Sequence, residues 1–420
     1  MEAMWQSPFL WMTIAVGLYM AWNIGANDVA NAMGTSVGSG ALTFKKAVII
    51  AAIFELLGAV LVGGHVTDTV RKGIVDPLVF QGEPMLLVIG MMSSLLSAAL
   101  WLHLASFLGW PVSTTHSIVG AVAGFGIVGA GFASVKGGTL GLIVLSWVTS
   151  PLVGALIALT VFRVCRKRIL DASDPVAAMI RVGPWLVLPV FLVLTLALIY
   201  KGLKNLKLDL PLGEAVLIGI GVGICSAFVA WLLLRRIKVR DGADRREQLE
   251  QVEKAFGWLQ ILTACYVAFA HGSNDVANAV GPLAAVVGTL SEGTVNAQVA
   301  LPVWVLWVGG IGIVVGLATY GKNVMATIGT KITELTPSRG FAATFGAATT
   351  ILIGSKLGMP LSTTHTMVGA VIGVGLARGI TALNMSVIRG VVASWVITLP
   401  FAGLLSGGLF WAIGSVTGYL

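Results

Sequence analysis

Two stretches of this chain occur twice, and the duplication restricts the folds that the chain can adopt. The sequence GANDVANAMG, which begins at Gly25, returns as GSNDVANAVG at Gly272. Likewise, SFLGWPVSTTHSIVGAVAGFG at Ser106 returns as SKLGMPLSTTHTMVGAVIGVG at Ser355. Two long motifs in the same order and at nearly the same spacing indicate two homologous repeats. We expect the repeats at residues 1–164 and 257–420, joined by a connecting region at 165–256.

The repeats lie in a strongly apolar chain. Hydrophobic residues make up 57% of it, charged residues make up 10%, and the mean hydropathy is +0.93. A water-soluble fold of this composition would have too little polar surface to cover its core. Since a membrane span needs ~20 apolar residues, the sequence predicts an all-α polytopic membrane protein with about twelve transmembrane or re-entrant helices. We expect them at 9–33, 44–64, 85–107, 112–131, 139–162, 184–201, 213–235, 258–288, 302–320, 341–357, 361–378 and 388–416.

The order of these segments predicts how the repeats are oriented. The first motif lies in the first segment, and its copy lies an odd number of membrane crossings later. This holds whether 85–131 and 341–378 are pairs of full spans or re-entrant hairpins, a choice that the sequence leaves open. The two repeats therefore have inverted topology, which in transporters places substrate and ion sites near the midplane at the repeat interface.

The basic residues set the orientation in the membrane. When alternate loops are assigned to opposite sides, one face collects most of the 26 Lys and Arg residues, and that face is expected to be cytoplasmic, with both termini outside. The net charge of +8 then reflects topology, and no nucleic-acid partner is indicated. The polar stretch 235–258 is expected to be a solvated cytoplasmic loop or surface helix. The three scattered cysteines indicate neither disulfides nor a metal site, and the N-terminus reads as a retained helix.

The N-D-V-A-N motif places polar side chains inside a predicted membrane helix. Residues four apart share a helix face, so the motif offers two amide oxygens beside one carboxylate. Asparagines can also simply bridge helices, but a carboxylate within a membrane is a functional candidate by default. Oxygen ligands with one negative charge suit a hard cation such as Na⁺, whereas proton coupling needs only the carboxylate. The predicted sodium ligands are Asn27, Asp28, Asn31, Asn274, Asp275 and Asn278.

The S-T-T-H element follows a Gly-x-Pro turn in both repeats, which predicts a helix that begins there. Free backbone N–H groups at a helix N-terminus favour an anion, and three hydroxyls add donors without adding charge. An ordinary N-cap is the alternative. The predicted anion ligands are Ser113, Thr114, Thr115, Ser362, Thr363 and Thr364, with Asp28 and Asp275 beside them. For the neighbouring His116 and His365, a structural role is favoured over contact with the substrate.

These paired motifs and inverted halves resemble the inorganic phosphate transporter (PiT) family over nearly the whole chain apart from the connecting region. Members move phosphate with Na⁺ or H⁺, and a related branch moves sulfate. The resemblance implies these functions for the motif residues above. Glu55 fits the family's intramembrane acid. Lys356 stands where the first repeat has Phe107 and either faces phosphate or extends to the membrane surface. His65, His103 and His271 have no counterpart in the other repeat, so structural roles are expected.

The sequence therefore predicts a sodium-coupled symporter that imports inorganic phosphate across a prokaryotic plasma membrane, with sodium as coupling ion and no cofactor. Proton coupling and sulfate are the alternatives within this fold. An intramembrane hydrolase built on Ser113, His116 and Asp28 is a remote alternative, because an enzyme needs one asymmetric site and this chain carries each candidate twice. A homodimer in the lipid bilayer is left open.

Overall fold

The structure is a computed structural model that describes residues 2–199, 210–238, 240, 243–295, 301–322, 324–325 and 332–420. The side chains of Asn31 and His65 lie outside the described part, as do the last residues of the segment expected at 184–201. Within the described ranges the regular elements are all helices, with one isolated β-bridge between Val75 and Val135. The predicted all-α fold is confirmed.

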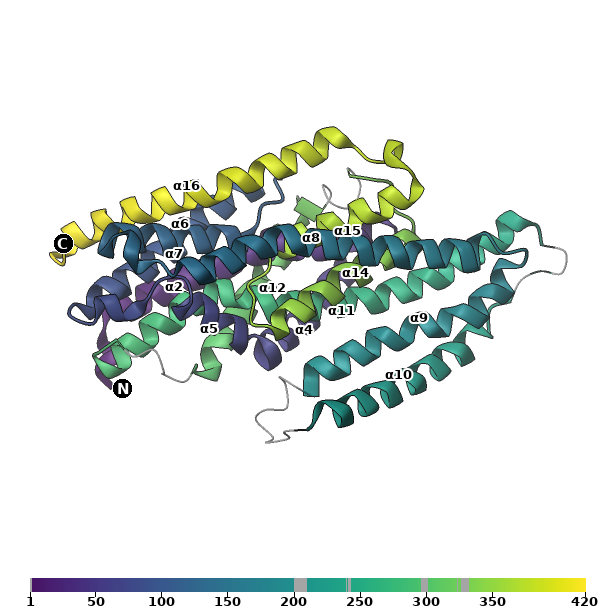
Figure 1. Ribbon diagram of the computed structural model, residues 1–420, viewed down its shortest axis with the longest axis horizontal. Helices are drawn as coiled ribbons and strands as arrows, with labels where there is room; N and C mark the ends of the chain where they lie inside the picture. The colour runs from purple at the N-terminus through teal and green to yellow at the C-terminus, as the bar shows by residue number, and fades with distance from the viewer. Residues whose placement is uncertain are drawn as a thin grey trace.

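The elements follow the chain order of Figure 1. The first expected repeat contains α1 (Glu2–Gln6), α2 (Pro8–Ile24), the π-helix η1 (Gly25–Val29), α3 (Ala30–Gly38), α4 (Phe44–Val62), α5 (Gly64–Lys72), η2 (Pro77–Phe80), α6 (Pro84–Phe107), α7 (Thr114–Ala130), η3 (Phe132–Ser134) and α8 (Gly137–Cys165). The connecting region contains η4 (Arg166–Leu170), α9 (Pro175–Ala197) and α10 (Leu212–Leu234). The rest contains α11 (Arg245–Glu292), α12 (Val303–Tyr320), α14 (Pro337–Lys356), α15 (Thr363–Arg378), η7 (Ile380–Ala382) and α16 (Met385–Thr417).

Each of the predicted segments corresponds to a helix, but two helices begin well before the predicted position. Helix α9 starts after Asp174, whose carboxylate accepts a hydrogen bond from the Ala177 amide at 2.9 Å. Helix α11 starts after Asp244, which caps the Glu247 amide at 2.8 Å. Both starts were missed because apolar content marks the membrane span, whereas an N-cap marks where the helix begins. Residues 245–258 are therefore helical, the second of the two forms expected for the polar stretch.

The described helices fit a multi-pass membrane protein. Seven are long and apolar enough to cross a membrane, and α4 together with the residues of α5 beyond a 66° bend makes an eighth candidate. Helices α9 and α10 form a hairpin beside the main body (Figure 1). The α10 side chains Leu217 and Phe228 are exposed, as expected of a surface that faces lipid.

Two further hairpins, α6–α7 and α14–α15, meet turn to turn in the interior. The Thr115 hydroxyl donates to the Leu361 carbonyl at 2.9 Å, and the Thr364 hydroxyl donates to the Val112 carbonyl at 3.1 Å. The same contact is thus made in both directions. Turns that meet inside the protein fit the re-entrant form of these segments, and α6 is in addition long and apolar enough to cross a membrane.

The second helix of each hairpin packs against a helix of the other repeat: α7 packs on α16, and α15 packs on α8. A Cβ atom on Gly124 of α7 would lie 2.1 Å from the Gly403 carbonyl oxygen of α16. A Cβ atom on Gly373 of α15 would lie 2.2 Å from the Ala155 carbonyl oxygen of α8. Only glycine permits such close backbone approach, so α7 and α16 pack closely against each other, as do α15 and α8.

Candidate functional site

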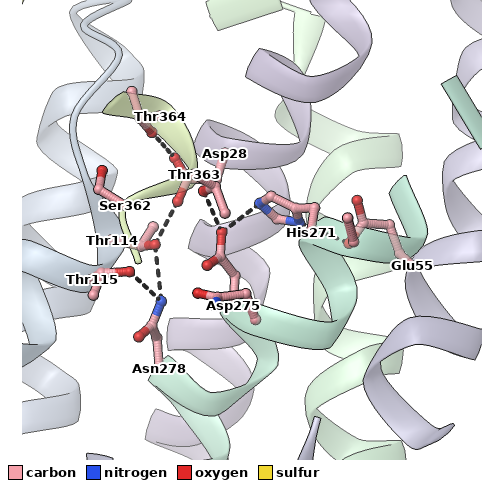
Figure 2. A network of polar contacts seen from close by, with 12 residues as sticks. Asp28, Glu55, Thr114, Thr115, His271, Asp275, Asn278, Ser362, Thr363 and Thr364 are labelled. Carbon is pink, nitrogen blue, oxygen red and sulfur yellow. Dashed lines mark hydrogen bonds and ion pairs between the residues drawn. The ribbon is translucent and has the colours of Figure 1, made fainter. Parts of the chain in front are cut away.

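The two N-D-V-A-N motifs lie in the interior beside the two hairpin turns (Figure 2). The first begins on η1 and continues into α3, and a π-helical turn of this kind is frequent at functional sites. The second lies in the middle of the continuous helix α11. Each motif follows a glycine that lets another backbone approach: a Cβ atom on Gly25 would lie 1.9 Å from the Ile313 oxygen, and one on Gly272 would lie 2.1 Å from the Glu55 oxygen.

Asp28 is buried and accepts hydrogen bonds from threonine hydroxyls of both hairpin turns. Thr114, in its own repeat, donates to one carboxylate oxygen. Thr364, in the other repeat, donates to the other oxygen at 2.5 Å. The first motif is therefore bonded to both turns at once.

Asp275 and its neighbour Asn278 contact both turns as well (Figure 2). The Thr363 hydroxyl donates to Asp275 Oδ2 at 2.6 Å. The Asn278 amide nitrogen donates across the repeat interface to the hydroxyls of Thr114 at 3.1 Å and Thr115 at 3.2 Å. The structure thus brings together the carboxylates and threonines that the sequence singled out at positions far apart.

His271 links this cluster to Glu55 of α4. Its Nε2 atom lies 2.7 Å from Asp275 Oδ2, and its Nδ1 atom lies 2.8 Å from Glu55 Oε2. All three side chains are buried. A structural role was expected for His271 because it has no counterpart in the first repeat. Its spacing of four residues from Asp275 was the signal that places both on one helix face.

Three oxygens of the second motif are buried without a hydrogen-bond partner in the described part of the chain. They are Asn274 Oδ1, Asp275 Oδ1 and Asn278 Oδ1. Buried acceptors are rarely left unpaired, and two amide oxygens with one carboxylate oxygen are a donor set that suits a hard cation. In addition, one ligand atom each of Asp28, His271 and Asp275 lie within 4.8 Å of one another. The cluster therefore has the chemistry to hold a cation.

The first asparagine of each motif fixes the neighbouring turn through its amide nitrogen. Asn27 donates to Ser106 Oγ at 3.0 Å and to the Trp110 carbonyl at 3.1 Å. Asn274 makes the equivalent bonds, to Ser355 Oγ at 3.0 Å and to the Met359 carbonyl at 3.2 Å. The two serines carry no predicted role from the sequence, although each opens a copy of the second repeated motif.

Ser113 and Ser362 are the N-caps of α7 and α15. Their hydroxyl oxygens accept the backbone N–H of His116 at 3.1 Å and of His365 at 3.2 Å. The N-cap expected as the alternative is therefore present for both serines. The caps begin two helices whose first turns carry the threonines of the cluster, and helix N-termini attract anions.

The remaining sequence candidates lie outside this cluster. His116 and His365 form a cluster of rings with Trp147 and Trp395. The centroid separations are 3.6 Å (Trp147 to His116, tilted), 4.3 Å (His116 to His365, edge to face) and 3.4 Å (His365 to Trp395, stacked). This packing fits the structural role expected for both histidines. His103 contacts the Tyr19 hydroxyl at 2.9 Å. Lys356 is exposed in the last turn of α14.

Comparison with known proteins identifies a protein family whose model matches most of this chain. The model of the phosphate transporter family, PHO4, matches residues 24–406. A putative phosphate permease of Haemophilus influenzae is 44% identical, covering 98% of each chain. One from Pyrococcus abyssi is 46% identical over 97% of this chain and 99% of that protein.

Two further matches extend the comparison. The chloroplastic inorganic phosphate transporter 2-1 of Arabidopsis thaliana is 44% identical over 97% of this chain and 73% of its own length. A solved structure described as the sodium-dependent phosphate transporter superposes with a TM-score of 0.90 at 41% identity, over 98% of this chain and all of that one.

Proposed function

Because the chain belongs to the phosphate transporter family, as the paired motifs indicated, we propose that it imports inorganic phosphate with sodium as the coupling cation. The observation that carries the proposal is the meeting of two helix N-termini, their threonines and two carboxylates at one buried point. The relatives are transporters and permeases, and the helices are those of a multi-pass membrane protein.

The pairing of hydroxyls with carboxylates favours phosphate over sulfate. The Thr114 and Thr363 hydroxyls can donate to an anion, and the carboxylates beside them, Asp28 and Asp275, can only accept. Phosphate near neutral pH still carries a proton to donate, whereas sulfate carries none. A carboxylate beside the anion therefore stabilises phosphate and repels sulfate.

Sodium is favoured over a proton by the neutral oxygens of the second motif. A proton would need only the Asp275 carboxylate, whereas Asn274 Oδ1 and Asn278 Oδ1 are extra buried acceptors without a partner among the described residues. A metal cation uses such oxygens as ligands. The structural relative described as sodium-dependent supports the same assignment.

The contacts of Ser113 support transport rather than hydrolysis. Its hydroxyl oxygen caps the backbone N–H of His116, while the His116 ring packs on Trp147. A serine nucleophile needs an imidazole within hydrogen-bond reach of its hydroxyl, and the described contacts of these two residues provide a cap instead.

Uptake of labelled phosphate into proteoliposomes tests the proposal. We expect accumulation under an inward sodium gradient, little under a potassium gradient, and weak competition by sulfate. A protonophore should leave the sodium-driven uptake intact. Uptake that follows a pH gradient and ignores sodium would reassign the coupling ion, and strong competition by sulfate would reassign the substrate. The proposed location is a prokaryotic plasma membrane, with both termini outside.

A further inference from the structure

The two N-D-V-A-N motifs have the same sequence but differ in which oxygens are already bonded. In the first motif, Asn27 Oδ1 accepts the Val112 amide N–H at 3.3 Å. Both carboxylate oxygens of Asp28 accept hydroxyls, from Thr114 and Thr364. Each of these oxygens therefore already accepts a hydrogen bond, which leaves it fewer lone pairs for a cation.

In the second motif one oxygen of each corresponding side chain has no hydrogen-bond partner in the described part of the chain, while Asp275 Oδ2 accepts from Thr363. Asn274 Oδ1 and Asp275 Oδ1 are buried, and neither accepts a hydrogen bond from the described residues. The same holds for Asn278 Oδ1. Leaving a buried acceptor unsatisfied destabilises a protein, so a cation that binds these oxygens removes that penalty and displaces no bond.

The difference between the motifs has a local cause in the residue four positions before each aspartate. In the first repeat this residue is Ile24, which makes no polar side-chain contact. In the second it is His271, whose ring nitrogens face carboxylate oxygens of Asp275 and Glu55. Because carboxylates bind the ring on both sides, its orientation is fixed. His271 and Thr363 both contact Asp275 at Oδ2, and Oδ1 is the oxygen left without a hydrogen-bond partner among the described residues.

The backbone differs at the same place. Gly25–Val29 is a π-helical turn, whereas the copy at residues 272–276 continues the α-helix α11. An α-helix places residues i and i+4 on one face. In the second motif this sets Asn274 and Asn278 one above the other, with Asp275 between them along the helix.

We propose that the two motifs take up their cations in a fixed order, with the motif of the second repeat first and without phosphate. In this scheme His271, held by Glu55, is the positioning residue that sets the order. The first motif receives its cation only when phosphate has taken over the hydroxyls that now bind Asp28. The inference rests on the proposed sodium-coupled transport and adds to it the order of binding.

Binding of labelled sodium to purified protein without phosphate tests the order. The wild type should bind one cation per chain, Asp28→Asn should keep that binding, and Asp275→Asn should weaken it at least about tenfold. Equal losses in both variants, or a larger loss in Asp28→Asn, would overturn the inference. A wild type that binds sodium only when phosphate is present would also overturn the inference and leave the proposed function standing. A wild type that binds no sodium with or without phosphate would instead defeat the proposed function, so the two failures can be told apart.

Variants of Glu55, which holds His271, test whether this pair causes the second motif to bind its cation first. Glu55→Ala should weaken phosphate-independent sodium binding by about 10-fold or more, as loss of an outer ligand partner does. Glu55→Gln retains an oxygen that accepts the His271 Nδ1–H and should recover most of the affinity. The matched control is Ile24→Ala, which removes the equivalent buried side chain and should leave the sodium affinity unchanged.

The phosphate KM separates a positioning role of Glu55 and His271 from a general effect on the structure. At saturating sodium, Glu55→Ala should have a phosphate KM close to that of the wild type, because the pair acts on the cation and not on phosphate. Glu55→Gln as defective as Glu55→Ala, or a loss of sodium affinity in Ile24→Ala, would contradict the role of the pair. If Glu55→Ala does not fold, the two aspartate variants still test the order of binding.

Discussion

The Thr364 hydroxyl of the second repeat donates a 2.5 Å hydrogen bond to the Asp28 carboxylate of the first, across 336 positions of sequence. The contact ties a hairpin turn of one repeat to the polar motif of the other. Asn278 makes the reverse crossing, to Thr114. The site therefore exists only where the repeats meet, and a movement of one repeat against the other would alter its geometry, as alternating access requires.

Removing one hydroxyl of the cluster should weaken phosphate binding. Thr114→Val and Thr363→Val keep the side-chain shape but remove a donor, and a charge-assisted hydrogen bond is worth roughly 1.5–3 kcal/mol. Phosphate affinity should therefore fall by about 10- to 100-fold. Equilibrium binding of labelled phosphate at saturating sodium measures this. Thr160→Val, on the exposed face of α8, is the control. Unchanged affinity in both site variants would move the anion site elsewhere.

Neutralising either aspartate should weaken the cation of its own motif and, through coupling, phosphate. Asp28→Asn and Asp275→Asn preserve the side-chain volume and remove a charge. Because cation and phosphate binding are coupled, a loss of cation affinity lowers the phosphate affinity as well. High external sodium should then partly restore phosphate uptake in each single variant, while the double variant stays inactive. The rate of phosphate uptake, measured at a series of external sodium concentrations, tests this rescue. Sodium that rescues neither variant, together with wild-type uptake driven by a pH gradient, would favour proton coupling.

The inverted arrangement predicts the sides from which two positions are reached. Lys46 lies in the first turn of α4 and Glu292 at the end of α11, and both are exposed. A cysteine at Lys46 should react with an impermeant thiol reagent only from the cytoplasm, and one at Glu292 only from outside. The two cysteine variants are labelled in intact cells and in inverted vesicles. Both are made in a background that lacks the exposed Cys225. Reaction of both from the same side would exclude the inverted topology.

The contact between α7 and α16 should not accept a larger residue. Gly124→Ala would place a Cβ atom 2.1 Å from the Gly403 carbonyl oxygen, and overpacking of this kind costs about 1–3 kcal/mol. Thermal unfolding in detergent should show a lower midpoint. Gly141→Ala in α8 is the matched control, because open space surrounds it and alanine favours a helix. Equal midpoints would mean that the helices separate at little cost.

The sequence alone determined the helical membrane fold, the duplication and the residue types of the site. These are local properties: apolar length marks each span, and a motif such as N-D-V-A-N can be recognised wherever it lies. The N-caps Asp174 and Asp244 could also be recognised in the sequence. Segments chosen by hydropathy miss these helix starts, because hydropathy reports burial in lipid and not where a helix begins.

Only the tertiary structure decided which of these residues meet, because contacts between distant segments depend on packing. His271 acquires its position from Glu55, which lies 216 residues away on another helix. Asn27 and Asn274 turn out to hold the hairpin turns by their amide nitrogens, while only Asn274 keeps an oxygen without a partner in the described chain. Identical motifs thus differ in chemistry because their neighbours differ, and a sequence motif does not include its neighbours in space.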